Sequence, residues 1–184
     1  KKYGVELLVC SSLNRNSGTM VREKTKMEKM LISGVAADKN VAKIRVAGLG
    51  NDPESTFRLL NLLDRNNLNI DVMIQSLGKD GTKSVSFTVA KPDMLRTIDV
   101  LNDNKDLLGI KKLDYDENVA KISVIGAGVR SHSGVAAKMF GALANAGINT
   151  EMVTTSEIRI TALIDEAYAD QAMRAIHETF LERV

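Results

Sequence analysis

The spacing of hydrophobic positions predicts that this chain contains two copies of one unit. In "KIRVAGL", Ile44 and Val46 lie on one face of an expected strand, while basic residues occupy the other face. The segment "VAKIRVAGLG" at 41–50 returns almost unchanged as "VAKISVIGAG" at 119–128. A strand and turn that occur twice indicate an internal duplication, so the segments that follow each copy should correspond.

The correspondence continues beyond the turn with a small change of spacing. "LNIDVMIQS" at 68–76 matches "INTEMVTTS" at 148–156, and this match places two extra residues inside the turn of the second copy. Loops that vary while the framework is kept are where function concentrates. The turn after the repeated strand is therefore the first place to look for a site.

A helix is expected after the first turn, over about 53–67. Asp52 provides a side-chain cap, and Pro53 provides a first residue whose ring fixes φ. The apolar stripe that predicts the buried face of this helix comprises Thr56, Phe57, Leu59, Leu60 and Leu63.

The remainder of the first copy predicts strand, hairpin, strand, helix and strand. The strands are expected at 68–76, 84–89 and 110–115, with "GKDG" as the hairpin turn and Pro92 opening the helix. The positions expected to face inward are Ile70, Val72, Ile74, Val85, Phe87, Val89, Leu95, Ile98 and Leu101.

The second copy predicts the same order but stops one strand short. Strands are expected at 121–127, 149–155 and 157–164, with a helix over about 133–146 that ends at Gly147. A last helix follows over about 166–180. The inward positions expected in the last strand and helix are Ile158, Ile160, Ala162, Ile164, Ala169, Ala172, Met173, Ile176 and Phe180.

The missing strand has one candidate in the chain. "LISGVA" at 31–36 is a spare apolar segment just before the first copy, and an unpaired sheet edge is a liability that proteins usually cover. We expect a strand from about 31–37 to complete the second module. The fold class is then α+β, with two ferredoxin-like βαββαβ modules, the first inserted into the second.

Composition narrows the classes of function. The chain has 184 residues, 44% of them hydrophobic, and a net charge of +2, without a basic stripe interleaved with aromatics or a long apolar run. Nucleic-acid and membrane partners are therefore not expected. A single cysteine, Cys10, suits a reducing, cytoplasmic compartment. His132 and His177 have no metal-ligand spacing, so no metal site is expected.

The second copy is specific enough to name a family. "VRSHSGVAAKMFGALANAGIN", "TTSEIRI" and "AMRAIHETF" closely resemble the regulatory region of aspartokinases. The first copy resembles the companion module of that region, and "KYGVELLVCSS" resembles the segment that follows the kinase domain. The resemblance implies two ACT domains, one at 41–116 and one at 31–37 plus 117–184, after a segment at 1–30 that follows a kinase domain and linker.

The resemblance also implies a function and partners. It implies feedback control of aspartate phosphorylation by lysine, threonine or both, with a kinase domain or catalytic subunit as partner and a homodimer formed through the ACT modules. The kinase active site is absent from this chain, so no cofactor is expected here, although the parent kinase would use ATP. A separate regulatory subunit and an excised piece of a longer kinase both fit the sequence. A constitutive assembly module that binds no ligand is the alternative function.

The first turn carries the predicted effector site. A helix N-terminus suits the carboxylate of an amino acid, and an acidic side chain suits its ammonium. Asp71 and Gln75 lie on the polar face of the next strand, and the resemblance adds Ile148 and Asn149 of the second module. The full expected set is Gly50, Asn51, Asp52, Pro53, Glu54, Ser55, Thr56, Ile70, Asp71, Gln75, Ile148 and Asn149.

This turn departs from the pattern of the family. Where Asp, any residue, Pro and Gly are common, this chain has Asn51, Asp52, Pro53 and Glu54. Two acidic residues then flank the expected carboxylate position. Either Asp52 and Glu54 turn toward solvent, or the site prefers a cationic amino acid such as lysine.

The turn of the second copy, "RSHSG", is expected to form a second site or an interface between modules or subunits. Arg130 is a candidate ligand for a carboxylate, with Glu151 opposite. The full expected set is Arg130, Ser131, Ser133, Gly134, Val135, Glu151, Ser156 and Glu157.

Overall fold

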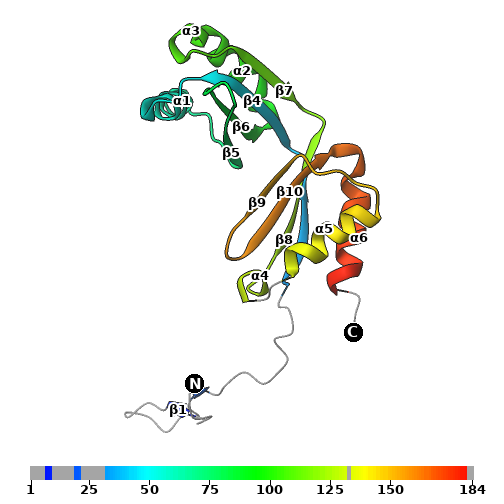
Figure 1. Ribbon diagram of the computed structural model, residues 1–184. Helices are drawn as coiled ribbons and strands as arrows, with labels where there is room; N and C mark the ends of the chain where they lie inside the picture. The colour runs from blue at the N-terminus through cyan, green and yellow to red at the C-terminus, as the bar shows by residue number, and fades with distance from the viewer. Residues whose placement is uncertain (1–6, 10–18, 22–31, 132–133, 182–184) are drawn as a thin grey trace.

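Two four-stranded antiparallel sheets, each covered by helices on one face, form most of the part of the chain that the structure describes (Figure 1). The computed structural model describes residues 7–9, 19–21, 32–131 and 134–181. Cys10, His132, Ser133 and most of the expected 1–30 segment lie outside the described residues. Within that segment, β1 (Leu7–Val9) and β2 (Thr19–Val21) pair antiparallel.

The first sheet has the strand order β5-β6-β4-β7. The repeated strand β4 is central, and it pairs with β6 on one side and β7 on the other. The "GKDG" hairpin is confirmed: the Gly78 N–H donates to the Thr82 carbonyl oxygen at 2.7 Å. The elements are β4 (Val41–Leu49), α1 (Pro53–Arg65), β5 (Met73–Leu77), β6 (Lys83–Ala90), η1 (Lys91–Asp93), α2 (Met94–Asp103), α3 (Lys105–Leu108) and β7 (Lys112–Asp116).

The second sheet has the equivalent order, β3-β8-β10-β9, and its fourth strand comes from before the first module. Strand β3 (Gly34–Asp38) pairs antiparallel with β8, which confirms the expected insertion. The strand begins three residues later than the apolar run suggested. The other elements are β8 (Val119–Ile125), α4 (Gly128–Ser131), α5 (Val135–Asn145), β9 (Met152–Thr155), β10 (Arg159–Asp165), η2 (Glu166–Tyr168) and α6 (Ala169–Leu181).

Each module has its own hydrophobic core between sheet and helices. In the first module, Ile44, Val46 and Phe87 are buried against α1 and α2, as the alternation predicted. In the second module, Ile122, Ile160 and Ile164 pack with residues of α5, α6 and the inner face of β3. Gly147, at a positive φ of 71°, ends the helical segment of α5 as expected.

Three of the predicted core positions are wrong. Phe57 and Leu95 are exposed, at 66% and 67%, because the buried face of α1 is centred on Leu59 and Leu63 and that of α2 on Thr97 and Leu101. Ile158 lies in the turn before β10 and is also exposed.

The prediction that Ile70, Val72 and Ile74 all face the core of the first module is also wrong. Regular pairing starts only at Met73, and Met73 packs on the first core with Ile70. Val72 and Ile74 point the other way, into a small cluster shared with the second module. Their burial therefore belongs to the contact between the modules rather than to the core of the first module.

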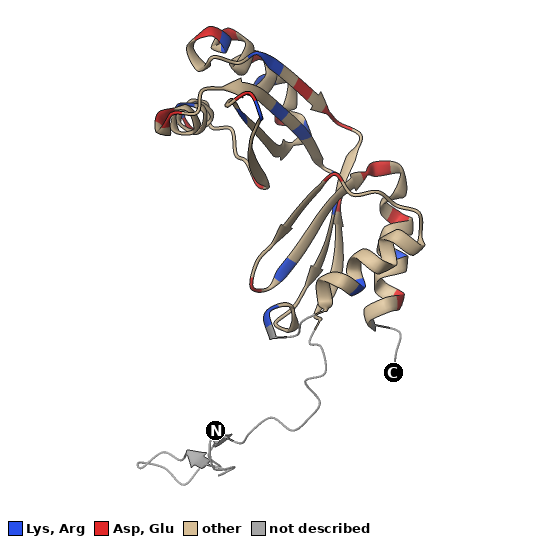
Figure 2. Ribbon diagram, in the orientation of Figure 1, with Lys and Arg blue, Asp and Glu red and all other residues tan. Residues whose placement is uncertain are grey.

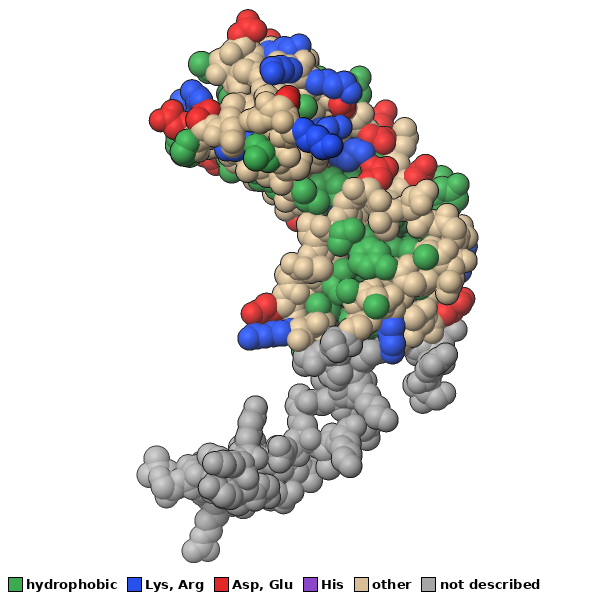
Figure 3. Space-filling view, viewed as in Figure 1, with side chains coloured by type: hydrophobic (Ala, Val, Ile, Leu, Met, Phe, Trp, Pro, Cys, Tyr) green, Lys and Arg blue, Asp and Glu red, His purple; other side chains and the backbone are tan. Residues whose placement is uncertain are grey.

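The two modules meet along a seam that repeats the internal duplication. We call it the junction seam and define it by the cluster Val41, Val72, Val119, Met152 and Leu163. Two pairs in this cluster, Val41 with Val119 and Val72 with Met152, occupy matching positions of the two copies. The chain crosses between the modules at this place, and the space-filling view shows the molecule hollowed beside it (Figures 1 and 3).

Ion pairs across the junction seam are reciprocal. Lys43 of the first module pairs with Glu151 of the second, and Lys121 of the second pairs with Asp71 of the first. Each module therefore contributes the lysine of its repeated strand and the acidic residue before its next strand. One further ion pair joins the two modules at matching positions. Lys91 directly follows β6, Glu166 directly follows the equivalent strand β10, and the two side chains pair at 2.8 Å.

Candidate functional site

The turn after β4 is organised by Asp52. Its carboxylate caps α1, because Oδ1 accepts from the backbone N–H of Glu54 at 3.0 Å and of Ser55 at 2.9 Å. The Ser55 hydroxyl donates to Oδ2, and this hydrogen bond is the main reason that the pKa of Asp52 is lowered. A Cβ at Gly50 would lie 2.5 Å from Asp52 Oδ2, so a larger residue there would require this carboxylate to move.

The capping has a consequence for ligand binding at this helix. Pro53 has no N–H, and the next two N–H groups of the first turn are bound by Asp52. A ligand carboxylate would have to displace this side chain to use them. The alternative in which both acidic side chains turn toward solvent holds for Glu54, whose side chain is 76% exposed, but Asp52 turns toward the helix.

Two further polar groups reach this turn. The Thr56 hydroxyl donates to Gln75 Oε1 at 2.7 Å, so the structure brings these two predicted residues together. Lys83 was missed by the sequence reasoning, and its Nζ donates to the Asp52 carbonyl oxygen at 2.8 Å. The signal for it was the hairpin register, which places Lys83 opposite Leu49 at the entrance to the turn. Asn51 lies exposed in the same turn.

Asp71 does not join this turn within the chain. It lies at the other end of the β5 segment, against the second module, and forms an ion pair with Lys121. Asp71 and Gln75 are four residues apart, which is about 13 Å along an extended segment. The structure thus separates the expected ammonium and carboxylate groups of the predicted site.

Ile148 and Asn149 follow α5 in the second module. Ile148 is buried in that module's core, and its N–H donates to the Leu143 carbonyl oxygen at 2.9 Å. Asn149 is exposed. None of the hydrogen bonds found among the described residues joins either of them to the Gly50–Thr56 turn.

The predicted residues of the second turn fall into separate places. Arg130 pairs with Glu157 at 2.9 Å, with both side chains 71% exposed. Val135 is buried at the start of α5, after Gly134 at a positive φ of 103°. Ser131 closes the short helix α4, and its side chain lies outside the described part of the chain, as does Ser133.

Glu151 and Ser156 complete the set. Glu151 belongs to the junction seam through Lys43. The Ser156 N–H donates to the Arg159 carbonyl oxygen at 2.7 Å, which closes the β9–β10 hairpin.

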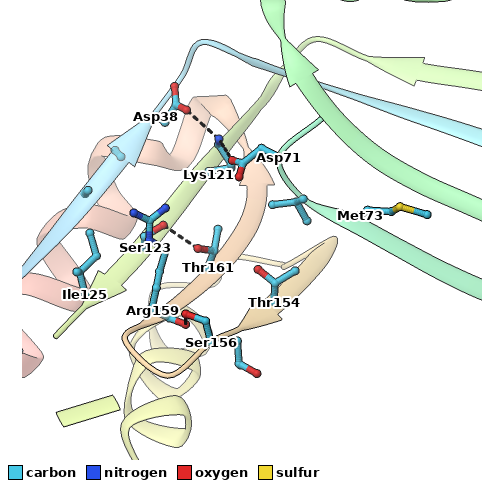
Figure 4. A pocket seen from close by; sticks show the side chains of 14 residues that line it. Asp38, Asp71, Met73, Lys121, Ser123, Ile125, Thr154, Ser156, Arg159 and Thr161 are labelled. Atoms are coloured by element: carbon cyan, nitrogen blue, oxygen red, sulfur yellow. Dashed lines mark hydrogen bonds and ion pairs between the residues drawn. The ribbon is translucent and has the colours of Figure 1, made fainter. Parts of the chain in front are cut away.

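A cavity of about 460 Å³ lies beside the junction seam, on the face of the second sheet that carries no helices (Figure 4). We call it the junction cavity. The sequence reasoning named only Asp71 and Ser156 as site residues among its lining residues, because its wall combines four strands of one module with the β5 segment of the other. Its lining residues are Ala36, Ala37, Asp38, Asp71, Val72, Met73, Lys121, Ser123, Ile125, Thr154, Thr155, Ser156, Arg159 and Thr161.

Lys121 is the most enclosed charged group of this cavity. Its ammonium lies 3.0 Å from Asp38 Oδ2 and also contacts Asp71. Burial works against the charged form, but the hydrogen bonds that the ammonium donates to Asp71 and Asp38 outweigh it, so the pKa of Lys121 is raised. For Asp38 burial likewise opposes ionisation, yet Lys121 and the Asn40 N–H lower its pKa overall.

The described residues contain no group of three or more His, Cys, Asp or Glu side chains placed to hold a metal ion. Over the same residues, no helix has the length and hydrophobicity to cross a bilayer. Both signs of charge are interspersed along the two modules (Figure 2).

Comparisons with known proteins connect this architecture to one enzyme family. The ACT domain model matches residues 122–180. An aspartokinase of Pseudomonas aeruginosa is 36% identical over 182 residues, which cover 97% of this chain and 44% of that protein. The chain therefore spans under half the length of this relative.

Two solved structures match over nearly their whole length. A chain in the crystal structure of aspartokinase alpha and beta subunits is 41% identical with a TM-score of 0.76, covering 81% of this chain and 98% of that one. The ligand-free regulatory subunit of aspartate kinase from Thermus thermophilus is 32% identical with a TM-score of 0.77, covering 82% and 99%.

Proposed function

Since this chain belongs to the aspartokinase family, as its regulatory region of two ACT modules, we propose that it senses amino acids and controls a kinase by feedback. The proposed effectors are lysine, threonine or both, and the proposed partner is an aspartate kinase domain or catalytic subunit that uses ATP. We further propose a cytoplasmic homodimer formed through the ACT modules.

The observation that carries the proposal is the meeting of charged groups from both modules beside one cavity. Asp71 comes from the first module, whereas Lys121 and Asp38 come from the second sheet. A ligand that binds such a place binds one arrangement of the modules better than another, which is what regulation requires. A coupling of about 1–3 kcal/mol between ligand and module arrangement gives a 5- to 150-fold effect.

Isothermal titration calorimetry of the 184-residue chain with lysine, with threonine and with both tests the proposal. We expect saturable heat with at least one of them and a matching rise in melting temperature. The absence of heat and of a thermal shift at millimolar concentration of every combination would contradict amino-acid sensing.

A constitutive assembly module without a ligand is the second candidate, and the capping of α1 favours it. Asp52 already occupies the N–H groups that an effector carboxylate would use. This candidate predicts a dimer whose sedimentation is the same with and without amino acids. Sedimentation velocity at several protein concentrations, with and without lysine and threonine, distinguishes the two functions.

A further inference from the structure

Within the part of the chain that the structure describes, two segments connect the modules, and they are copies of each other (Figure 1). We call residues 38–41 the first crossover and residues 116–119 the second crossover. Both have the sequence Asp, any residue, Asn, Val. In each, the Asp carboxylate accepts the N–H of the Asn two residues later at 2.9 Å. Because the local turn is the same in both, a difference in how they are held comes from the groups around them.

The first crossover is fastened to the second module by two ion pairs. Asp38 lies opposite Lys121 in the β3–β8 ladder, and the two side chains meet at 3.0 Å. Lys39 pairs with Asp170 of α6 at 2.9 Å. The Lys121 side chain is only 15% exposed, so its pair is screened less by solvent than the exposed pair of Lys39. The segment that leaves the second module is therefore held to that module by its side chains.

The second crossover has no equivalent ion pairs to the first module, which it leaves. Asp116 lies opposite Lys43 in the β4–β7 ladder, but Lys43 pairs with Glu151. The second residue of α6 is an acid, whereas the second residue of α2 is Leu95, so the exposed Glu117 meets no charge there. Among the described residues, no ion pair reaches Asp116 or Glu117.

The backbone hydrogen bond beside each crossover shows the same difference. In the second module, the Glu166 N–H donates to the Asn118 carbonyl oxygen at 2.9 Å. At the matching place in the first module, the Lys91 nitrogen lies 3.4 Å from the Asn40 carbonyl oxygen. This second bond is weak, since N–H···O bonds usually measure roughly 2.7–3.2 Å. Both crossovers are therefore held more firmly at the second module than at the first.

The remaining contact between the modules is small enough to allow bending. The junction seam contains far fewer buried apolar residues than the core of either module. The other attachments are ion pairs made by lysines, among them Lys43 with Glu151 and Lys91 with Glu166. Lysine has a flexible four-carbon stem, so these pairs can follow a small movement of one module against the other.

We propose that the two modules bend at the first module's end of both crossovers, at 40–41 and at 116–117, while the crossovers move with the second module. Strand β4 begins at Val41 and β7 ends at Asp116, so both bending points are element termini, where hinges are commonly found. This inference goes beyond the proposed function, because the bending belongs to the chain alone and requires no ligand.

The two bending points act together. Val41 and Val119 belong to the same buried cluster, which places the two crossovers side by side. A rotation of the first module therefore changes the backbone at both crossovers. It follows that fastening the second crossover to the first module restrains the first crossover as well.

Amide hydrogen exchange of the 184-residue chain without amino acids, followed by NMR, tests where the bending occurs. The N–H groups of Lys91 and Glu166 occupy matching positions and each donates to an Asn carbonyl oxygen, so each is the internal control of the other. After correction for intrinsic rates, the Lys91 N–H should exchange at least about tenfold faster, because local opening occurs on its side. Equal rates, or faster exchange at Glu166, would overturn the proposal.

A variant that fastens the second crossover tests whether the two bending points act together. Leu95→Lys places a cation where α6 has the acid that pairs with Lys39, and so gives Glu117 a partner. Because the new pair is exposed, exchange of the Lys91 N–H should slow by only about two- to fivefold. Leu95→Ala, which removes the same apolar side chain without adding a charge, is the matched control and should leave this rate unchanged.

The outcomes of these experiments do not depend on amino-acid binding. An exchange rate at Lys91 that is the same in Leu95→Lys and Leu95→Ala would contradict the proposal, because the two crossovers would then move independently. Circular dichroism melting shows that each variant is folded. Calorimetry with lysine and threonine tests the proposed function separately, so either conclusion can fail while the other stands.

Discussion

Single acidic residues in this chain have different tasks, except where they occupy matching positions of the repeat. Asp52 stabilises the start of α1, while Asp71 and Asp38 hold the ammonium of Lys121 beside the second module. Glu151 occupies the position in the second copy that Asp71 occupies in the first, and it pairs with the equivalent lysine, Lys43.

Removing the cap of α1 should lower stability. Asp52→Ala leaves the N–H groups of Glu54 and Ser55 without a partner, and we expect the free energy of unfolding to fall by about 1 kcal/mol. Urea unfolding followed by circular dichroism measures it. Asp64→Ala, at an exposed position of the same helix, is the control, and an equal loss in both variants would contradict the capping role.

The lowered pKa of Asp38 makes a pH prediction. Because its pKa is lower in the folded chain than in the unfolded chain, its contribution to stability is present above pH of about 4 and is lost as the pH falls through the folded value. The difference in unfolding free energy between the unaltered chain and Asp38→Asn should therefore shrink from pH 7 to pH 3. A difference that stays constant over this range would show that the carboxylate gains nothing from Lys121.

Among the elements, β3 decides whether the second module is complete. It supplies the edge strand beside β8, and its alternate residues face opposite sides of the sheet. Val35 packs on the helix-covered core, whereas Ala36 faces the junction cavity. This one strand thus serves both the stability of the second module and the wall of the junction cavity.

A pair of substitutions tests this alternation. Val35→Asn puts an amide against the core and should lower the unfolding free energy by about 1–3 kcal/mol. Ala36→Asn, one residue later, carries the same low strand propensity but faces the cavity, so its loss should be much smaller. Thermal unfolding of the two variants measures the contrast, and equal losses would mean that the register of β3 differs from the one described.

The order of elements was predictable from the repeat, because strand alternation and an incomplete second copy both left clear marks. Which side of each helix is buried was not predictable in the same way. Phe57 and Leu59 both fit a helical stripe, and only contact with the sheet decides that Leu59 is buried. The site was harder still: the cap at Asp52 was predicted correctly, but the pairing of Asp71 with Lys121 depends on how one module meets the other.

In the whole molecule, the two modules are related by their internal duplication and face one another across the junction seam. Matching lysines and matching acids form the reciprocal pairs, and matching apolar residues form the cluster between them. Such a contact has few apolar groups and several charges, which suits an arrangement that a ligand can shift.

Reversal of one reciprocal pair tests the seam. Lys43→Glu and Glu151→Lys should each lower the unfolding free energy by about 0.2–1 kcal/mol, and the double variant should recover most of the loss. Urea unfolding of the complete double-mutant cycle measures the coupling. Lys79→Glu, in the β5–β6 hairpin, is the control, and purely additive effects of the pair would show that the seam does not use it.

Hydrogen exchange of the 184-residue chain, with and without saturating lysine or threonine, tests amino-acid sensing most directly. An effector that binds where the modules meet should slow exchange at the backbone around 36–38, 71–73 and 121–125, which come from both modules. We predict this protection with lysine. Exchange that is identical in the presence and absence of every amino acid, at millimolar concentration, would contradict the account.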